Sequence, residues 1–273
     1  MRLSLVLSIQ AARFNAVALT GDWEANIARI AGWGYDGVEL AIRDPRLVDG
    51  AALLDTLARY GLRVPAIGTG QAWGEEGLSF TDPDPARREQ AIQRVSAHVP
   101  LAAQANALII IGLLRGVVRP GVSPKQALAW LVEALQRTTE AAGARGVRLC
   151  LEPINRYETT LINTVAQGLD LIERVGASNL GLLLDTFHMN IEEPVLEDSI
   201  RAAGDRLYHV HVADSNRWYP GAGHVDFAGV IRALRQAGYT GWLSAEIMPE
   251  PDPDTAARRT VEYLRRLQSC VTG

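Results

Sequence analysis

The feature that most constrains this chain is an alternation, repeated along its length, between short apolar runs and longer amphipathic segments. The apolar runs are rich in Val, Ile and Leu, a composition typical of buried strands. The longer segments repeat their apolar residues every three to four positions, as one face of a helix does. Strands that alternate with helices in this way build parallel sheets.

Eight runs are predicted to be strands. They are Arg2–Ser8, Gly37–Ala41, Arg63–Gly68, Ala107–Ile111, Arg148–Glu152, Gly181–Asp185, Leu207–Val212 and Trp242–Glu246. The predicted helices are Asp22–Trp33, Ala51–Tyr60, Pro85–Ala105, Ser123–Gly143, Thr164–Val175, Phe227–Ala237 and Asp254–Gln268. Because no polar linker interrupts the series, we expect one closed (β/α)8 TIM barrel, a single catalytic domain over residues 1–273.

The chain length agrees with this expectation, since 273 residues suit a barrel that needs about 250. Two smaller domains and a doubly wound open sheet are the alternatives. An open sheet of that kind favours a glycine-rich fingerprint after the first strand, and the residues Ser8 to Ala12 do not form one.

Composition excludes several classes of function. With 27 basic and 31 acidic residues, the net charge of −4 gives no reason to expect a nucleic-acid partner or an anionic membrane surface. No apolar stretch approaches the roughly 20 residues of a membrane span. The N-terminal apolar run breaks at Gln10 without a convincing cleavage site, so we expect a first strand and a cytoplasmic protein. The single lysine, Lys125, stands at a predicted helix start, which argues against Schiff-base chemistry.

Polar residues end the last four predicted strands. These are Glu152, Asp185, His211 and Glu246, at successive intervals of 33, 26 and 35 residues. Each interval is about one strand–helix unit. Because the chemistry of a TIM barrel lies at the C-terminal ends of its strands, we expect the four side chains to converge on one mouth.

Three carboxylates and one imidazole form an oxygen-rich donor set. Any one of them alone is more often a loop contact or a helix cap, so the expectation rests on the joint pattern. Together in an apolar pocket they would repel one another unless a cation lay between them. Such a site suits Mn²⁺, Mg²⁺ or Co²⁺ better than a thiolate-rich zinc site.

Further polar residues surround these strand ends. His209 and His211 share a strand face, so at least one should be a hydrogen-bonded interior residue. Glu39, at the end of the second strand, is expected at most to line the pocket. Polar and aromatic residues interleave after strands five, six and seven, as a hydroxylated ligand requires. The segment from Pro220 to Phe227 is interpreted as structural, and His224 is given no catalytic role.

Three segments resemble the xylose-isomerase-like sugar epimerases, most closely the D-tagatose/D-psicose 3-epimerase group. They are Leu151–Glu158, Leu184–Glu193 (LDTFHMNIEE) and His211–Arg217. The resemblance implies an enzyme that inverts the carbon alpha to the ketone of a keto-sugar through an enediolate. It also implies a homo-oligomer, since proteins of this family are commonly dimers or tetramers.

The resemblance also implies roles for individual residues. Glu152, Asp185, His211 and Glu246 would hold one divalent metal ion, usually Mn²⁺, with Co²⁺ or Mg²⁺ as alternatives. Glu152 and Glu246 would act in addition as the acid–base pair. The substrate oxygens would be contacted by Glu158, His188 and Arg217.

The segment after His211, together with those after strands two and three, is more similar to a branch that contains 5-keto-L-gluconate epimerase. A keto-hexonate substrate needs a cation for its carboxylate. Arg43, Arg115 and Arg156 are all predicted near the barrel mouth, and the sequence does not choose among them.

Three other functions remain open at this level. An isomerase that interconverts ketose and aldose, or acts on hydroxypyruvate, would use similar enediol chemistry on the same barrel. An apurinic-site endonuclease would need a histidine-rich zinc cluster, and the chain has only five histidines. A non-catalytic sugar-binding barrel would be expected to have lost a ligand, and all four are present.

Overall fold

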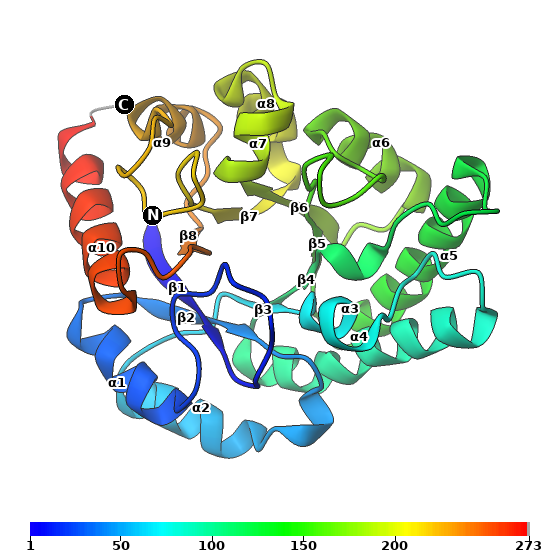
Figure 1. The fold of residues 1–273 in the computed structure, drawn as a ribbon, viewed down its shortest axis with the longest axis horizontal. Coiled ribbons are helices and arrows are strands. Elements are labelled where there is room, and N and C mark those ends of the chain that lie inside the picture. Colours follow the sequence, from blue (N-terminus) through cyan, green and yellow to red (C-terminus); the bar gives the residue numbers. More distant parts are fainter. Residues whose placement is uncertain (272–273) are drawn as a thin grey trace.

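The computed structural model describes residues 1–271 and has eight parallel strands that close into a barrel in chain order, with β1 paired to β8. Figure 1 shows the strands at the centre and the helices around them. The predicted single (β/α)8 barrel is confirmed. Its strands are β1 (Arg2–Ser8), β2 (Gly37–Ala41), β3 (Ala66–Gly68), β4 (Leu108–Ile111), β5 (Leu149–Leu151), β6 (Leu180–Asp185), β7 (Leu207–His211) and β8 (Trp242–Ala245).

Seven helices match the predicted ones to within two residues at each end. They are α1 (Trp23–Gly32), α2 (Gly50–Arg59), α4 (Pro85–Ala105), α5 (Pro124–Gly143), α6 (Val165–Val175), α9 (Phe227–Gln236) and α10 (Pro253–Cys270). Side-chain caps explain this agreement: the Ser123 hydroxyl accepts from the Gln126 N–H, and Asp226 accepts from the Gly229 N–H. No helix among the described residues is long and apolar enough to cross a membrane.

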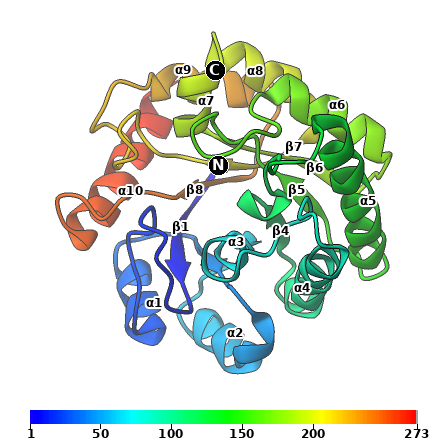
Figure 2. The same ribbon diagram turned by 45° about the vertical axis from the view of Figure 1, so that its right-hand side comes forward.

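Three helices were not predicted: α3 (Gln71–Glu76), α7 (Thr186–Glu192) and α8 (Leu196–Ala203). Asp185 ends β6 and at once caps α7, because its carboxylate accepts from the Phe187 N–H at 2.8 Å. No loop therefore separates the strand from the helix. Figures 1 and 2 show α8 between α6 and α9, where it completes the outer ring.

Successive side chains on each strand point alternately into the barrel and toward the helices. Ile110, Cys150 and Leu183 form an apolar cluster that contains no helix residue, inside the barrel. Their neighbours along the chain pack in the larger cluster beneath the helices. Since residues two apart on a strand point to the same side, Glu152 points into the barrel as Cys150 does, and Asp185 as Leu183 does.

The strand ends differ slightly from prediction. β5 and β8 end at Leu151 and Ala245, so Glu152 and Glu246 directly follow their strands rather than ending them. The Glu152 N–H still donates to the Ile111 carbonyl at 3.2 Å, which keeps the inward direction of the strand. The last four strands thus bring their polar side chains to one end of the barrel.

Candidate metal centre

The four residues at the ends of the last strands come together. Glu152, Asp185, His211 and Glu246 each offer one ligand atom, and these atoms lie within 4.8 Å of one another. His211 Nδ1 is 3.8 Å from Glu152 Oε1, 3.7 Å from Asp185 Oδ2 and 3.6 Å from Glu246 Oε2. The convergence expected from their spacing is what the structure has.

Two atoms of this group are buried without a hydrogen-bond partner, Glu152 Oε1 and His211 Nδ1. A buried acceptor left unpaired costs about 1–3 kcal/mol, so such atoms call for a partner. Three carboxylate oxygens and an imidazole nitrogen fit a hard divalent cation in this place.

The pKa values in the cluster reflect crowded negative charge. Burial and the neighbouring Glu246 carboxylate raise the pKa of Glu152 to about 8. Burial alone would raise the pKa of Asp185, but the Arg217 guanidinium together with His188 and His211 outweighs burial and lowers that pKa below its ordinary value. Burial disfavours the charged form of His211, yet Glu39 and Glu246 raise its pKa well above the usual value.

Arg217 bridges two of the carboxylates. Its guanidinium donates to Asp185 Oδ2 at 2.6 Å and to Glu246 Oε2, and it lies 4.9 Å from the centre of the Phe187 ring. The residue is only 7% exposed, and its φ of +65° is in the left-handed region. A non-glycine residue there carries about 1–3 kcal/mol of strain, which the surrounding loop must offset.

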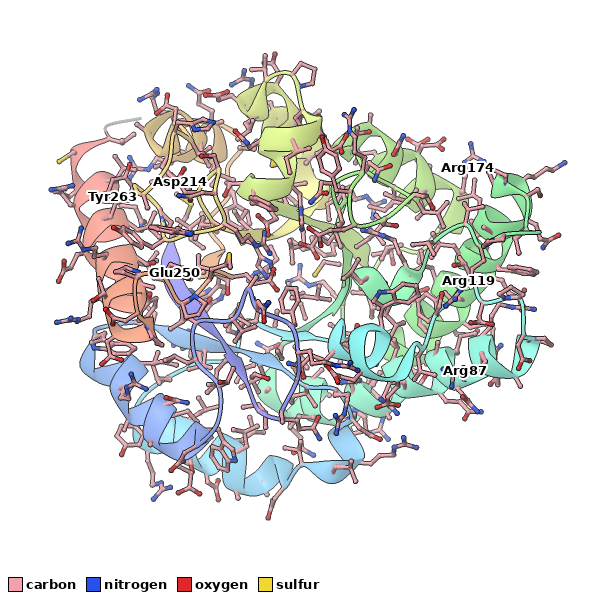
Figure 3. The ribbon with its side chains drawn as sticks, in the orientation of Figure 1. Arg87, Arg119, Arg174, Asp214, Glu250 and Tyr263 are labelled. Atoms are coloured by element: carbon pink, nitrogen blue, oxygen red, sulfur yellow. The ribbon has the colours of Figure 1, made fainter. Side chains whose placement is uncertain are left out.

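The loop that holds Arg217 is built around Asp214 (Figure 3). The buried Asp214 carboxylate accepts from the N–H groups of Ser215 at 2.7 Å, Gly221 at 2.8 Å and Val225 at 3.1 Å. A side chain at Gly223 would meet Asp214 Oδ1 at 2.3 Å, so this turn requires glycine. The structural interpretation of the segment from Pro220 to Phe227 agrees with this arrangement.

His188 lies on α7 with its ring against the cluster. Its Nε2 is 3.6 Å from Glu152 Oε1, and its Nδ1 is 2.8 Å from Asn155 Nδ2. The amide of Asn155 can adopt only one orientation, because Nδ2 also faces Glu158 Oε1 at 2.8 Å and Oδ1 accepts from the Tyr157 N–H at 3.0 Å. Asn155 therefore donates to Nδ1, and the neutral His188 ring carries its proton on Nε2.

The neutral form of His188 is also favoured by its surroundings. Burial and the positive charge of Arg217 lower the pKa of His188 to about 3, although Asp185 acts in the opposite direction. His188 therefore presents a neutral Nε2–H donor toward the pocket. Asn155, which sets this orientation, was missed from the sequence because nothing in the segment that follows strand five marks its contact with a later helix.

A pocket opens above the cluster and encloses about 740 Å³, part of it open to solvent. Its two walls differ in chemistry. The β5–β8 wall consists of Glu152, Ile154, Glu158, His188, His211, Arg217 and Glu246. The β1–β4 wall consists of Val6, Phe14, Glu39, Ala41, Gly68, Thr69, Gly70, Gln71, Gly74, Ile110, Gly112 and Leu113. All three expected substrate contacts, and Glu39 as well, thus line the pocket.

The three arginines considered for a substrate carboxylate do not line it. Arg43 Nε lies 3.5 Å from Glu76 Oε1, and Arg156 forms an ion pair with Glu192 at 2.8 Å. Arg115 is fully buried and donates to the Glu152 carbonyl oxygen, behind the wall. The three arginines follow the C-terminal ends of β2, β4 and β5, but none of them lines the pocket.

Comparisons with known proteins agree with this picture. The L-ribulose 3-epimerase of Methylomonas sp. (strain DH-1) is 36% identical over 93% of this chain and 90% of its own length. The ketose 3-epimerase of Arthrobacter globiformis is 33% identical over 76% of this chain and 71% of its own. The crystal structure of D-allulose 3-epimerase from Methylomonas sp. in complex with D-allulose matches with a TM-score of 0.82, at 31% identity and 97% coverage of both chains.

The family model described as xylose isomerase-like TIM barrel matches residues 27–267. This range contains all four candidate metal ligands and all three candidate substrate contacts. Together with the closed barrel, it means that the chain belongs to the xylose isomerase-like TIM-barrel family.

Proposed function

We propose that this protein is a divalent-metal-dependent ketose 3-epimerase, which inverts the carbon next to the ketone of a neutral keto-sugar. The observation that carries the proposal is the placement of Glu152 and Glu246. They directly follow strands β5 and β8, converge on one cluster beneath the pocket, and share it with Asp185 and His211. The names of the relatives at 33–36% identity support the same reaction class.

The four ligands would hold one divalent ion, and we propose Mn²⁺, with Co²⁺ or Mg²⁺ as alternatives of the same hard character. When bound, the ion supplies a positive charge that polarises the ketone and stabilises the negative charge of an enediolate. Asp185 and His211 serve as ligands only. Their burial keeps water away from the carboxylates that carry the proton.

Glu152 and Glu246 act as the acid–base pair. One carboxylate removes the proton from the carbon alpha to the ketone, and the electron pair of that C–H bond moves into the enediolate. The other glutamic acid then delivers a proton to the opposite face of the same carbon, which inverts it. In the reverse reaction the two exchange roles, as microscopic reversibility requires.

The remaining polar residues of the wall position the sugar. The neutral His188 ring donates from Nε2, and the Arg217 guanidinium donates beside it. The Glu158 carboxylate accepts from sugar hydroxyls at the more exposed edge. These three contacts would fix the ketone end of the substrate against the acid–base pair.

A neutral ketose suits the pocket better than a keto-hexonate. Among the described residues that line it, Arg217 is the only arginine or lysine, and it already faces Asp185 and Glu246. The described residues of the β1–β4 wall offer apolar groups, the neutral polar Thr69 and Gln71 and the carboxylate of Glu39, but no arginine or lysine for a substrate carboxylate. An unpaired carboxylate against that wall would be costly to desolvate.

The test is to incubate the Mn²⁺-loaded protein with L-ribulose, D-allulose, D-fructose and 5-keto-L-gluconate and to identify the products by chromatography and NMR. The proposal expects each accepted neutral ketose to be converted to its C3 epimer. An aldose product would make the protein an isomerase. Turnover of the keto-hexonate alone would overturn the proposed substrate class.

A further inference from the structure

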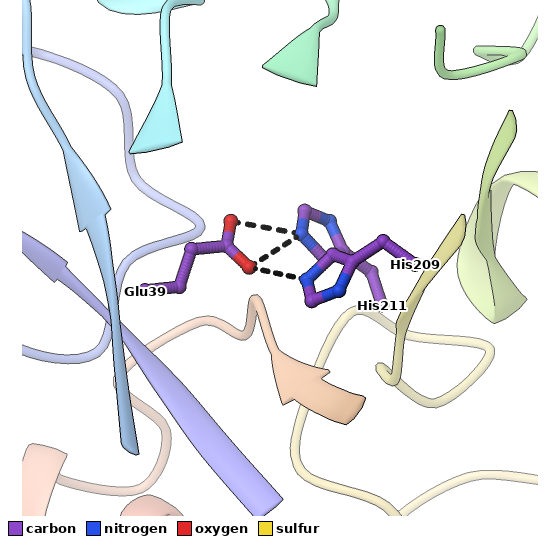
Figure 4. A group of neighbouring side chains, drawn as sticks. All are labelled: Glu39, His209 and His211. Atoms are coloured by element: carbon purple, nitrogen blue, oxygen red, sulfur yellow. Dashed lines mark hydrogen bonds and ion pairs between the residues drawn. The ribbon is translucent and has the colours of Figure 1, made fainter. Parts of the chain in front are cut away.

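A second cluster of buried side chains spans the barrel beside the candidate metal centre. The Glu39 carboxylate comes from β2, on the opposite side of the barrel from His209 and His211 of β7 (Figure 4). All three residues are at most 1% exposed. Figure 4 shows the carboxylate facing both rings. The roles proposed above do not use Glu39 or His209.

The hydrogen bonds of Glu39 fix the protons on both rings. His209 Nε2 lies 2.8 Å from Glu39 Oε2, and His211 Nε2 lies 2.9 and 3.1 Å from the two carboxylate oxygens. An ionised carboxylate only accepts hydrogen bonds, so both rings must donate from Nε2. In a neutral His211 ring the lone pair is then on Nδ1, the atom that faces Glu152, Asp185 and Glu246.

We infer that Glu39 and His209 are positioning residues for the metal ligand His211 and so set the metal affinity of the site. Glu39 holds the His211 ring in the tautomer and the orientation that direct Nδ1 at the metal position. His209, bonded to the same carboxylate, keeps Glu39 in place. This inference rests on the metal site of the proposed function.

The direct alternative is that Glu39, His209 and His211 themselves bind a second ion, since their ligand atoms also lie within 4.8 Å of one another. The hydrogen bonds favour the positioning role, because both carboxylate oxygens already accept from Nε2–H donors of the rings. Replacing a carboxylate that orients a metal-bound histidine typically weakens metal binding by about 10- to 100-fold. A positioning role predicts one ion per chain, whereas a ligand role for the cluster predicts two.

The experiment measures metal binding, not activity. The Mn²⁺ dissociation constant and stoichiometry are determined by competition with a chromophoric chelator for the wild type, Glu39→Gln and His209→Gln. A glutamine at position 39 keeps the size, but its amide accepts from one ring only and opposes the N–H of the other. His98→Gln is the matched control, since His98 is equally buried and its ring nitrogens contact only the carbonyls of Arg94 and Ile42.

We expect one ion per wild-type chain, an affinity 10- to 100-fold weaker in Glu39→Gln, and a smaller loss in His209→Gln. Combining the two changes should add little to Glu39→Gln alone, because His209 acts through Glu39. The absorption spectrum of bound Co²⁺ should also shift in Glu39→Gln, as the imidazole ligand is reoriented. His98→Gln should change neither the affinity nor the spectrum, whatever it does to thermal stability.

The outcomes separate the two proposals. Folded Glu39→Gln and His209→Gln with affinities within twofold of the wild type and an unchanged Co²⁺ spectrum would overturn this inference and leave the proposed function intact. Two ions per wild-type chain, one of them lost in Glu39→Gln, would make the cluster a ligand set instead. A wild type that binds no divalent ion would reject the proposed metal site itself. If Glu39→Gln does not fold, His209→Gln alone decides between these results.

Discussion

The two walls of the pocket divide the work of the site. The β5–β8 wall supplies three of the four candidate ligands, including both proposed proton carriers, together with the proposed substrate contacts His188 and Arg217. The fourth candidate ligand, Asp185, is buried beside them. The β1–β4 wall supplies mostly glycines and apolar side chains, with Thr69 and Gln71 as neutral polar residues and Glu39 as its only charged residue among those described. The difference indicates that chemistry is concentrated in the second half of the barrel. The first half shapes the space in which the far end of a sugar would lie.

Removing a proton carrier should have the largest effect. Glu152→Gln or Glu246→Gln should lower kcat on a ketose by on the order of 10³-fold or more, because an amide neither takes up nor delivers the proton. Steady-state kinetics at saturating Mn²⁺ measures this effect. Glu250→Gln, which changes a carboxylate after the same strand as Glu246 but outside the pocket lining, is the control. Near-wild-type activity in either active-site variant would refute the proposed roles.

Removing the hydrogen bond that orients His188 should have the next largest effect. Asn155→Leu keeps the side-chain size but deletes the hydrogen bonds to His188 and Glu158, so kcat should fall by about 10- to 100-fold. Asn163→Leu is the control, since Asn163 lies in the same loop and its side chain contacts the Ile154 and Thr159 carbonyls. If both variants lose the same activity, loop stability rather than the His188 tautomer is responsible.

The titratable groups of the β5–β8 wall should also make metal binding depend on pH. With its pKa raised to about 8, Glu152 holds a proton at pH 7 in the metal-free protein, and the raised pKa of His211 acts in the same direction. A metal ion must displace such protons. Affinity should therefore rise with pH, by roughly tenfold per unit for each proton displaced, and should rise less steeply above pH 8.

Calorimetry of Mn²⁺ binding in two buffers with different protonation enthalpies measures the proton release. At least half a proton per ion should be released at pH 7 and fewer at pH 9. Equal binding heats in both buffers at pH 7 would show that the ligands are already deprotonated.

The smallest effect is expected from the β1–β4 wall. Phe14 lines the pocket and is 38% exposed, so Phe14→Ala should remove about 1 kcal/mol of contact with the substrate and raise KM several-fold. kcat should change little, since the contact is the same in the ground and transition states. Leu47→Ala, at an exposed apolar residue outside the pocket, is the control. A kcat effect as large as that of Asn155→Leu would erase the proposed contrast between the walls.

The candidate ligands on the β5–β8 side of the barrel were also the part of the site that could be predicted from the sequence. All four candidate ligands stand at or directly after the C-terminal end of a strand. Because the strands of a barrel all end at the same mouth, a spacing of one strand–helix unit was enough to predict that these side chains meet. The caps at Ser123 and Asp226 likewise placed their helices, because a cap acts within three residues.

What could not be predicted depends on contacts between distant parts of the chain. Glu39 bonds to His209 and His211 across the barrel, at separations of 170 and 172 residues, and only closure of the barrel makes those pairs neighbours. The arginines near the mouth were equally ambiguous, because the partners Glu76 and Glu192 that hold Arg43 and Arg156 belong to other units of the fold. α7 was missed because Asp185 both ends β6 and caps the helix, which leaves no turn signal between them.

The central claim is that two carboxylates of the β5–β8 wall, Glu152 and Glu246, remove and return the proton on the carbon alpha to the ketone of a neutral sugar. The most direct measurement is NMR of an accepted ketose incubated with the Mn²⁺-loaded protein in D₂O. The proposed reaction predicts deuterium at C3 of the epimerised product, at a rate that falls with turnover in Glu152→Gln and Glu246→Gln. Deuterium at C2 of an aldose product, or exchange at C3 that persists in both variants, would contradict it.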